Sequence, residues 1–185
     1  MVAAISRILV DPAGAWSALA APPREDETLL RYVLPLAALG PVCALVGGAA
    51  FHRGSFVMLA AGTFVGIVCE VIGVAAIAAA LGQLAGLLGG ERSYARALSL
   101  AAYASTPRWL AGILLLFTPS LGIVAGLAGL YGFWILERSV VPMIGVPQPL
   151  AGRFALAAIV VLVLGWFGVA LLVRVLGAFA NGAPL

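Results

Sequence analysis

The sequence contains no lysine, a single histidine and two cysteines, and only 9% of its 185 residues are charged. A soluble domain has about 25% charged and about 45–50% apolar residues, whereas 64% of this chain is hydrophobic. The mean hydropathy is +1.17. This balance excludes a soluble globular enzyme, a disordered chain and a nucleic-acid-binding domain, and it indicates a chain whose solvent is lipid.

Chemistry-bearing side chains are equally scarce. The one histidine, His52, falls in a predicted aqueous turn, whereas a Ser-His-Asp site needs its histidine beside a nucleophile and an acid. Cys43 and Cys69 lie in apolar runs as small core residues, so no cluster supplies the three or four ligands of a zinc site. His-Glu-x-x-His, Gly-x-Ser-x-Gly and Walker motifs are absent. We therefore expect no catalysis, no metal and no cofactor.

Long apolar segments predict an all-α polytopic membrane helix bundle, because a spanning helix needs about 20 apolar residues. The five predicted spans cover residues 32–51, 56–88, 97–117, 121–136 and 154–176. They form a membrane domain over residues 29–178, between an N-terminal segment with its linker (1–28) and a tail (179–185). Thr106-Pro107-Arg108 is expected to interrupt the third span, and Glu137 to Gly152 is expected to be a polar loop.

A competing interpretation fuses Trp109–Leu136 into one kinked helix and gives four spans. We favour five, because Thr118-Pro119-Ser120 between two apolar runs is a stronger turn signal than kink signal. With five spans, seven loop arginines fall on one side and two on the other, so the positive-inside rule places the N-terminus in the cytoplasm. With four spans, seven loop arginines would fall on one side of the membrane and three on the other. Abundant arginine without lysine suggests a GC-rich bacterial genome, and hence the bacterial inner membrane.

The first 20 residues predict an amphipathic segment on the membrane surface. Ile5, Ile8 and Leu9 share one helical face, Asp11-Pro12 breaks the helix, and Trp16 continues the apolar stripe. Such a face lies in the interface with its apolar side toward the acyl chains. The alternative is a disordered leader.

Two charged residues fall where charge is costly. An ionised group at the bilayer centre costs at least about 2.5–3.5 kcal/mol, so Glu70 in the second span must be protonated, paired or hydrated. Arg108 in the third span is its candidate partner. One interpretation is a proton- or ion-responsive site, and the other is a buried pair that fixes helix register.

Glycines at four-residue spacing mark a candidate helix-packing row in the second span. Gly82, Gly86 and Gly90 would let another helix approach closely. The simpler alternative is that the row reflects the abundance of glycine, of which the chain has 23.

Several short motifs together resemble a known family. Asp11-Pro12 followed by Trp16 is similar to its amphipathic entry segment. The run Gly89-Gly90-Glu91-Arg92-Ser93-Tyr94, leading into Ala102-Tyr103-Ala104-Ser105-Thr106-Pro107, is similar to its central signature, in which a glycine-rich loop precedes a Tyr-Ala-x-x-Pro segment. The chain thus resembles the Ypt-interacting-protein (Yip) family, in its prokaryotic type.

The resemblance implies a five-span membrane protein with a cytoplasmic N-terminus, and trafficking adaptors of Rab GTPases among its eukaryotic relatives. The Asp-Leu-Tyr-Gly-Pro motif of those relatives is absent, so a GTPase partner rests on the resemblance alone. We expect a non-enzymatic protein that organises membrane or binds partners, in the manner of a trafficking adaptor. Its partners would be the lipid bilayer, a second copy or another protein, and not nucleic acid. The alternative is a small transporter or channel that uses Glu70 and Arg108.

The five-span topology makes a direct prediction. A reporter fused after Leu185 should be extracytoplasmic and one inserted at Ser93 cytoplasmic, because an odd number of spans separates the two positions. Alkaline phosphatase and fluorescent-protein fusions measure this. Both reporters on the same side would reject five spans.

Overall fold

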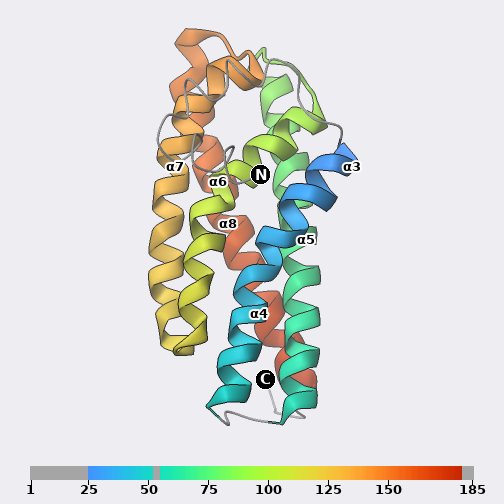
Figure 1. Cartoon of the computed structure of the whole chain (residues 1–185). Coiled ribbons are helices and arrows are strands. Elements are labelled where there is room, and N and C mark those ends of the chain that lie inside the picture. Colours follow the sequence, from blue (N-terminus) through green and yellow to red (C-terminus); the bar gives the residue numbers. More distant parts are fainter. Residues whose placement is uncertain (1–24, 52–54, 181–185) are drawn as a thin grey trace.

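The computed structural model describes residues 25–51 and 55–180, and these contain helices and no strand (Figure 1). The long helices are α4 (Leu34–Ala50), α5 (Phe56–Leu87), α6 (Tyr94–Ala111), α7 (Gly122–Ile144) and α8 (Gln148–Ala180). The short ones are α3 (Glu25–Thr28), the π-helix η1 (Leu29–Val33) and the 3-10 helices η2 (Gly112–Leu116) and η3 (Pro119–Leu121). Successive long helices alternate in direction (Figure 1). The predicted all-α bundle is confirmed.

The bundle has two distinct ends. The polar end holds the α5–α6 and α7–α8 connections, and the turn end holds the α4–α5 and α6–α7 connections (top and bottom of Figure 1). In the part of the chain that the structure describes, four segments are long and apolar enough to cross a membrane: Leu29–Ala50, Phe56–Leu87, Pro119–Arg138 and Gln148–Leu176.

Helix α6 does not reach that apolarity because it faces protein. It packs against α4, α5 and α7, and every residue from Ala97 to Pro107 is buried. The Thr106 hydroxyl donates to the carbonyl of Ala102 at 3.0 Å and lies 2.8 Å from the Tyr32 hydroxyl. A helix enclosed by other helices can carry such polar groups when they find partners inside the bundle.

The connection after α6 shows whether the chain turns near Pro119 or continues as a single kinked helix. Helix α6 continues as η2 to Leu116, and η3 turns the chain at Pro119–Leu121 into α7. Helices α6 and α7 are antiparallel neighbours (Figure 1). The single kinked helix over Trp109–Leu136 is therefore wrong.

The expectation of a polar loop from Glu137 to Gly152 is also wrong. The polar stretch from Glu137 to Gly152 is largely helical, because α7 ends at Ile144 and α8 begins at Gln148. Gly145, with φ of 68°, ends α7 in the left-handed region that glycine adopts without strain. The prolines at the start of α8 sit in a first turn, where no helical hydrogen bond is lost.

Proline inside the spans does not interrupt them. Helix α6 runs through Pro107 and α4 runs through Pro41, contrary to the break expected at Thr106-Pro107-Arg108. The nearby hydroxyls bond other carbonyls: Thr106 donates to Ala102 at 3.0 Å, and Thr63 of α5 donates to Pro41 at 3.3 Å. Membrane helices tolerate proline where neighbouring helices pack around it.

The predicted glycine row does not form one packing face. Gly82 is buried against the start of α6, whereas Gly86 is exposed beside Arg92. Gly90 lies beyond the end of α5, where a β-carbon would approach Val146 to 2.7 Å. The row therefore ends with the helix, because α5 stops at Leu87.

Other glycines make the close helix contacts. A β-carbon at Gly132 of α7 would overlap the carbonyl oxygen of Ala104 in α6, and one at Gly112 would come within 2.8 Å of the Cα of Gly40 in α4. Backbones thus meet directly where α6 and η2 contact their neighbours, as small residues allow in membrane bundles.

Candidate functional site

The structure brings Glu70 and Arg108 together in the middle of the bundle. Arg108 Nη1 donates to Glu70 Oε1 at 2.9 Å, and Arg108 Nη2 donates to Glu70 Oε2. The two side chains are 14% and 19% exposed for Glu70 and Arg108 respectively. This two-pronged pairing is the strongest geometry that a guanidinium and a carboxylate can form. It joins α5 to α6 at one fixed register.

Aromatic side chains surround the pair. Trp109 Nε1 donates to Glu70 Oε2 at 3.1 Å, and the Arg108 guanidinium lies over the Trp166 ring, 5.4 Å from its centroid. Trp166 in turn stacks on Phe133, with ring centroids 5.6 Å apart. Cation–π attraction is strongest when the cation is removed from water, so Trp166 adds to the stabilisation of Arg108.

Two buried N–H groups at this site have no acceptor. Arg108 Nε and Trp166 Nε1 make no hydrogen bond with any described residue. A buried unsatisfied donor costs about 1–3 kcal/mol. The pair therefore has a fully occupied carboxylate and an incompletely occupied guanidinium.

An apolar cavity of about 890 Å³ adjoins the pair on the side of the turn end. Helices α4, α5, α7 and α8 supply most of its walls. Its polar side chains are Thr63, Glu70 and Arg108, together with the indoles of Trp109 and Trp166. Thr63 already donates to the carbonyl of Leu59 at 2.9 Å. We call this space the apolar cavity; its inner end is the Glu70–Arg108 pair.

A second set of polar contacts ties the polar end together. Arg96 pairs with Glu91 at 3.2 Å and donates through Nη1 to the carbonyl of Met143 at 3.1 Å. The Glu91 amide donates to the carbonyl of Ile144 at 2.9 Å. The glycine-rich loop before α6 is thereby fastened to the end of α7. Sequence reasoning missed these contacts, because carbonyl acceptors leave no signal in a residue pattern.

Sequence reasoning also missed the contact between Tyr32 and α6. Tyr32 approaches Tyr103 edge-on, with ring centroids 4.8 Å apart, and its hydroxyl meets Thr106. Tyr103 and Thr106 belong to the Tyr-Ala-x-x-Pro segment, which was the available signal. That segment is the buried centre of the bundle and not a surface motif.

The remaining predicted site residues are placed as follows. Ile5, Ile8, Leu9 and Trp16 lie outside the described residues, so the amphipathic segment stays a prediction. Among residues 25–51 and 55–180, no group of three or more His, Cys, Asp or Glu side chains is placed to hold a metal ion.

The structure makes a specific prediction for the pair. Glu70→Gln or Arg108→Leu alone should lower stability by about 3–5 kcal/mol, because each leaves an unmatched buried group. Glu70→Leu with Arg108→Leu should recover most of this loss. The double variant should still be less stable than the unaltered protein by about 1–3 kcal/mol, because Glu70→Leu leaves the Trp109 N–H without its acceptor. Thermal unfolding in detergent measures all four proteins.

The Arg96–Glu91 pair at the polar end supplies the control. Glu91 is 55% exposed, so Glu91→Gln should change stability by no more than about 1 kcal/mol. If the double variant were no more stable than the worse single variant, the two charges would not be acting as a pair.

The chain is similar to a known family over most of its length: a family model described as the Yip1 domain matches residues 6–172. The match confirms the family to which the motifs pointed. No curated protein and no solved structure matches the chain.

Proposed function

Since the chain belongs to the Yip1-domain family, we propose that this integral membrane protein is non-enzymatic and organises the lipids or proteins around it through helix packing. We place it in the bacterial cytoplasmic membrane with its N-terminus in the cytoplasm. The observation that carries the proposal is that, within residues 25–51 and 55–180, the one largely buried ion pair consists of Glu70 and Arg108 bonded to each other at the inner end of an apolar cavity.

The distribution of charge supports this proposal. Apart from Glu70 and Arg108, the described charged residues lie toward the two ends of the bundle. A permeation path needs polar groups in succession, because ions and polar solutes are not stable in an apolar channel. Among the described residues of the cavity wall, Thr63 carries the only hydroxyl, and its hydrogen bonds to Leu59 and Pro41 both go to backbone carbonyls.

The region between the pair and the polar end is filled. Its largest fully buried side chains are apolar and include Val74, Leu81, Leu98, Leu100, Leu136 and Phe154. The buried hydroxyls of Ser99, Ser105 and Thr106 lie among them. A packed core of this kind supports a scaffold and not a conduit.

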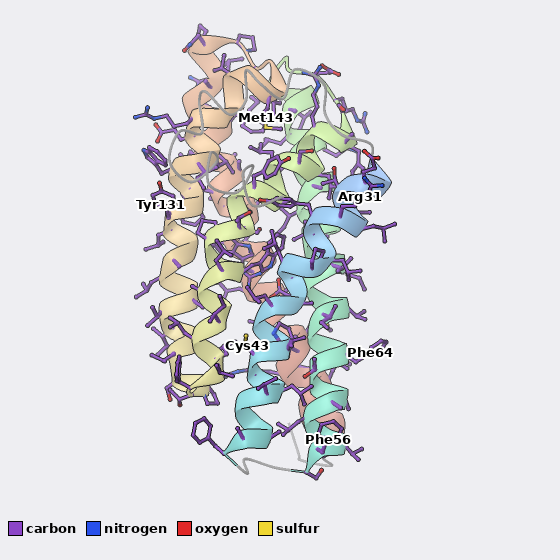
Figure 2. The ribbon with its side chains drawn as sticks, viewed as in Figure 1. Arg31, Cys43, Phe56, Phe64, Tyr131 and Met143 are labelled. Atoms are coloured by element: carbon purple, nitrogen blue, oxygen red, sulfur yellow. The ribbon has the colours of Figure 1, made fainter. Side chains whose placement is uncertain are left out.

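The outer surface supplies the contacts for partners. Phe64 and Tyr131 point away from the bundle on opposite sides (Figure 2), and Phe64 is 70% exposed. Such faces suit acyl chains or the helices of another membrane protein, including a second copy of this chain. A soluble partner, which the family resemblance suggests would be a GTPase, would dock at the polar end, where Arg92, Arg138 and Arg153 are exposed.

The second candidate function is a small transporter. It is favoured by one observation: a glutamate and an arginine lie at mid-bundle and line the inner end of the cavity. Ionisable residues in that position mark proton and substrate routes in many transporters. Protonation of Glu70 would release Arg108 and open the pair.

A flux measurement separates the two candidates. The protein is reconstituted into vesicles that contain a pH-sensitive dye, and a pH gradient is applied with and without a membrane potential. We expect the same slow dissipation as in protein-free vesicles, because large buried apolar side chains occupy the half of the bundle between the pair and the polar end.

The control is the double variant Glu70→Leu with Arg108→Leu in the same vesicles, because it removes both charges and should keep most of the stability. It should dissipate the gradient at the rate of the unaltered protein. Dissipation that the unaltered protein accelerates and the folded double variant abolishes would establish the transporter and overturn the scaffold.

A further inference from the structure

The apolar cavity has the size and chemistry of a binding site for a slender apolar molecule. We propose that it binds one acyl chain of a membrane lipid, which enters from the turn end and reaches the Glu70–Arg108 pair. The inference rests on the proposed function, because a scaffold without a polar path leaves this cavity to the hydrocarbon that surrounds it. The membrane component that we expect the protein to hold is thus the acyl chain of a lipid.

The length of the cavity matches the depth of one leaflet. Its wall on α5 extends from Met58 to Glu70, and its wall on α7 from Gly122 to Phe133. At 1.5 Å rise per residue these walls are about 18 Å and about 17 Å long. Half of a hydrocarbon core of about 30 Å is about 15 Å. A chain whose head group stays at the membrane surface therefore spans the cavity.

The cavity opens sideways toward lipid. Ile123 and Leu127 of α7 and Phe167 of α8 line it and are nevertheless exposed, by 73%, 58% and 72%. Helices α7 and α8 meet where Gly129 lies under the Trp166 ring, closer to the inner end. An acyl chain can thus enter between these helices without crossing water.

The inner end is compatible with an uncharged chain terminus. The two charges neutralise each other, and Trp166 covers one face of the guanidinium at 5.4 Å. The stacked rings of Trp166 and Phe133 both line the cavity there. A terminal methyl group would meet aromatic carbon beside an ion pair whose charges already neutralise each other.

The lining of the cavity argues against water as its content. Apart from Thr63, the ion pair and the two indoles, its walls are apolar. Apolar cavities in proteins stay dry and take up apolar molecules.

Photocrosslinking in vesicles tests the proposal with the full-length chain. The vesicles contain phosphatidylcholine and phosphatidylglycerol with a trace of phospholipid that carries a diazirine either near the ester or near the terminal methyl group of one chain. We expect the methyl-end probe to label Phe133 and Trp166, and the ester-end probe to label Met58 and Ile123. Peptide mass spectrometry locates the adducts. Both probes should also label Phe64 on the outer surface, which serves as the reference.

Cavity-filling variants sharpen the test. A β-carbon at Gly62 or Gly126 meets no atom within 4 Å, and both glycines line the cavity, so Gly62→Phe with Gly126→Phe should fill it. Cavity adducts should fall several-fold while the Phe64 adduct persists. Gly168 is also unhindered but does not line the cavity, so Gly168→Phe is the matched control and should retain all adducts.

Two results would overturn the proposal: no cavity adducts beside normal Phe64 adducts, or cavity adducts that the filling variant leaves unchanged. A variant that fails to fold also loses the Phe64 adduct, and Gly126→Leu then replaces it. If neither cavity adducts nor flux were observed, the bound acyl chain would be rejected while the scaffold function would not. Flux that depends on the ion pair would instead reject the scaffold function, so the two failures are distinguishable.

Discussion

A charge that enters hydrocarbon must be matched there, and the Glu70–Arg108 pair is how this bundle meets that constraint. The two-pronged pairing fixes α5 and α6 in one register, and Trp109 and Trp166 hold it from either side. Arg108 can lie at mid-bundle only because α6 is enclosed by α4, α5 and α7. The central position of α6 then explains why its serine, threonine and tyrosine residues are tolerated where the surrounding solvent is lipid.

Small residues complete that arrangement. Backbones meet at Gly132 and Ala104, and again at Gly40 and Gly112, so helices pack closely around α6 and η2. Large side chains fill the half of the bundle toward the polar end, whereas the other half retains the apolar cavity. The ion pair stands at the boundary between the two halves. It therefore closes the filled core on one side and forms the inner end of a lipid-accessible space on the other.

Much of this fold can be predicted from the sequence, whereas the remaining features depend on which helices pack against each other. The apolar runs indicate the long helices, and the cost of an isolated charge points to Glu70 and Arg108 as partners. Pro107 suggested a break, yet a helix packed on all sides passes through it. Gly82, Gly86 and Gly90 follow a regular spacing, yet Gly86 is exposed beside Arg92 and Gly90 lies beyond the end of α5 at Leu87. The cavity has no local signal, because it is the space that five helices leave between them.

The contact between Glu70 and Arg108 in a bilayer is the most direct measure of whether this constraint organises the protein. Solid-state NMR on protein in lipid bilayers, labelled with nitrogen in arginine and carbon in glutamate, records the dipolar coupling between guanidinium nitrogens and side-chain carboxyl carbon. We expect a strong coupling that survives in Glu91→Gln, which removes the exposed pair, and disappears in Glu70→Gln. A coupling that Glu70→Gln leaves unchanged would show that Glu70 and Arg108 do not meet in the membrane, and the register of α5 on α6 described above would be wrong.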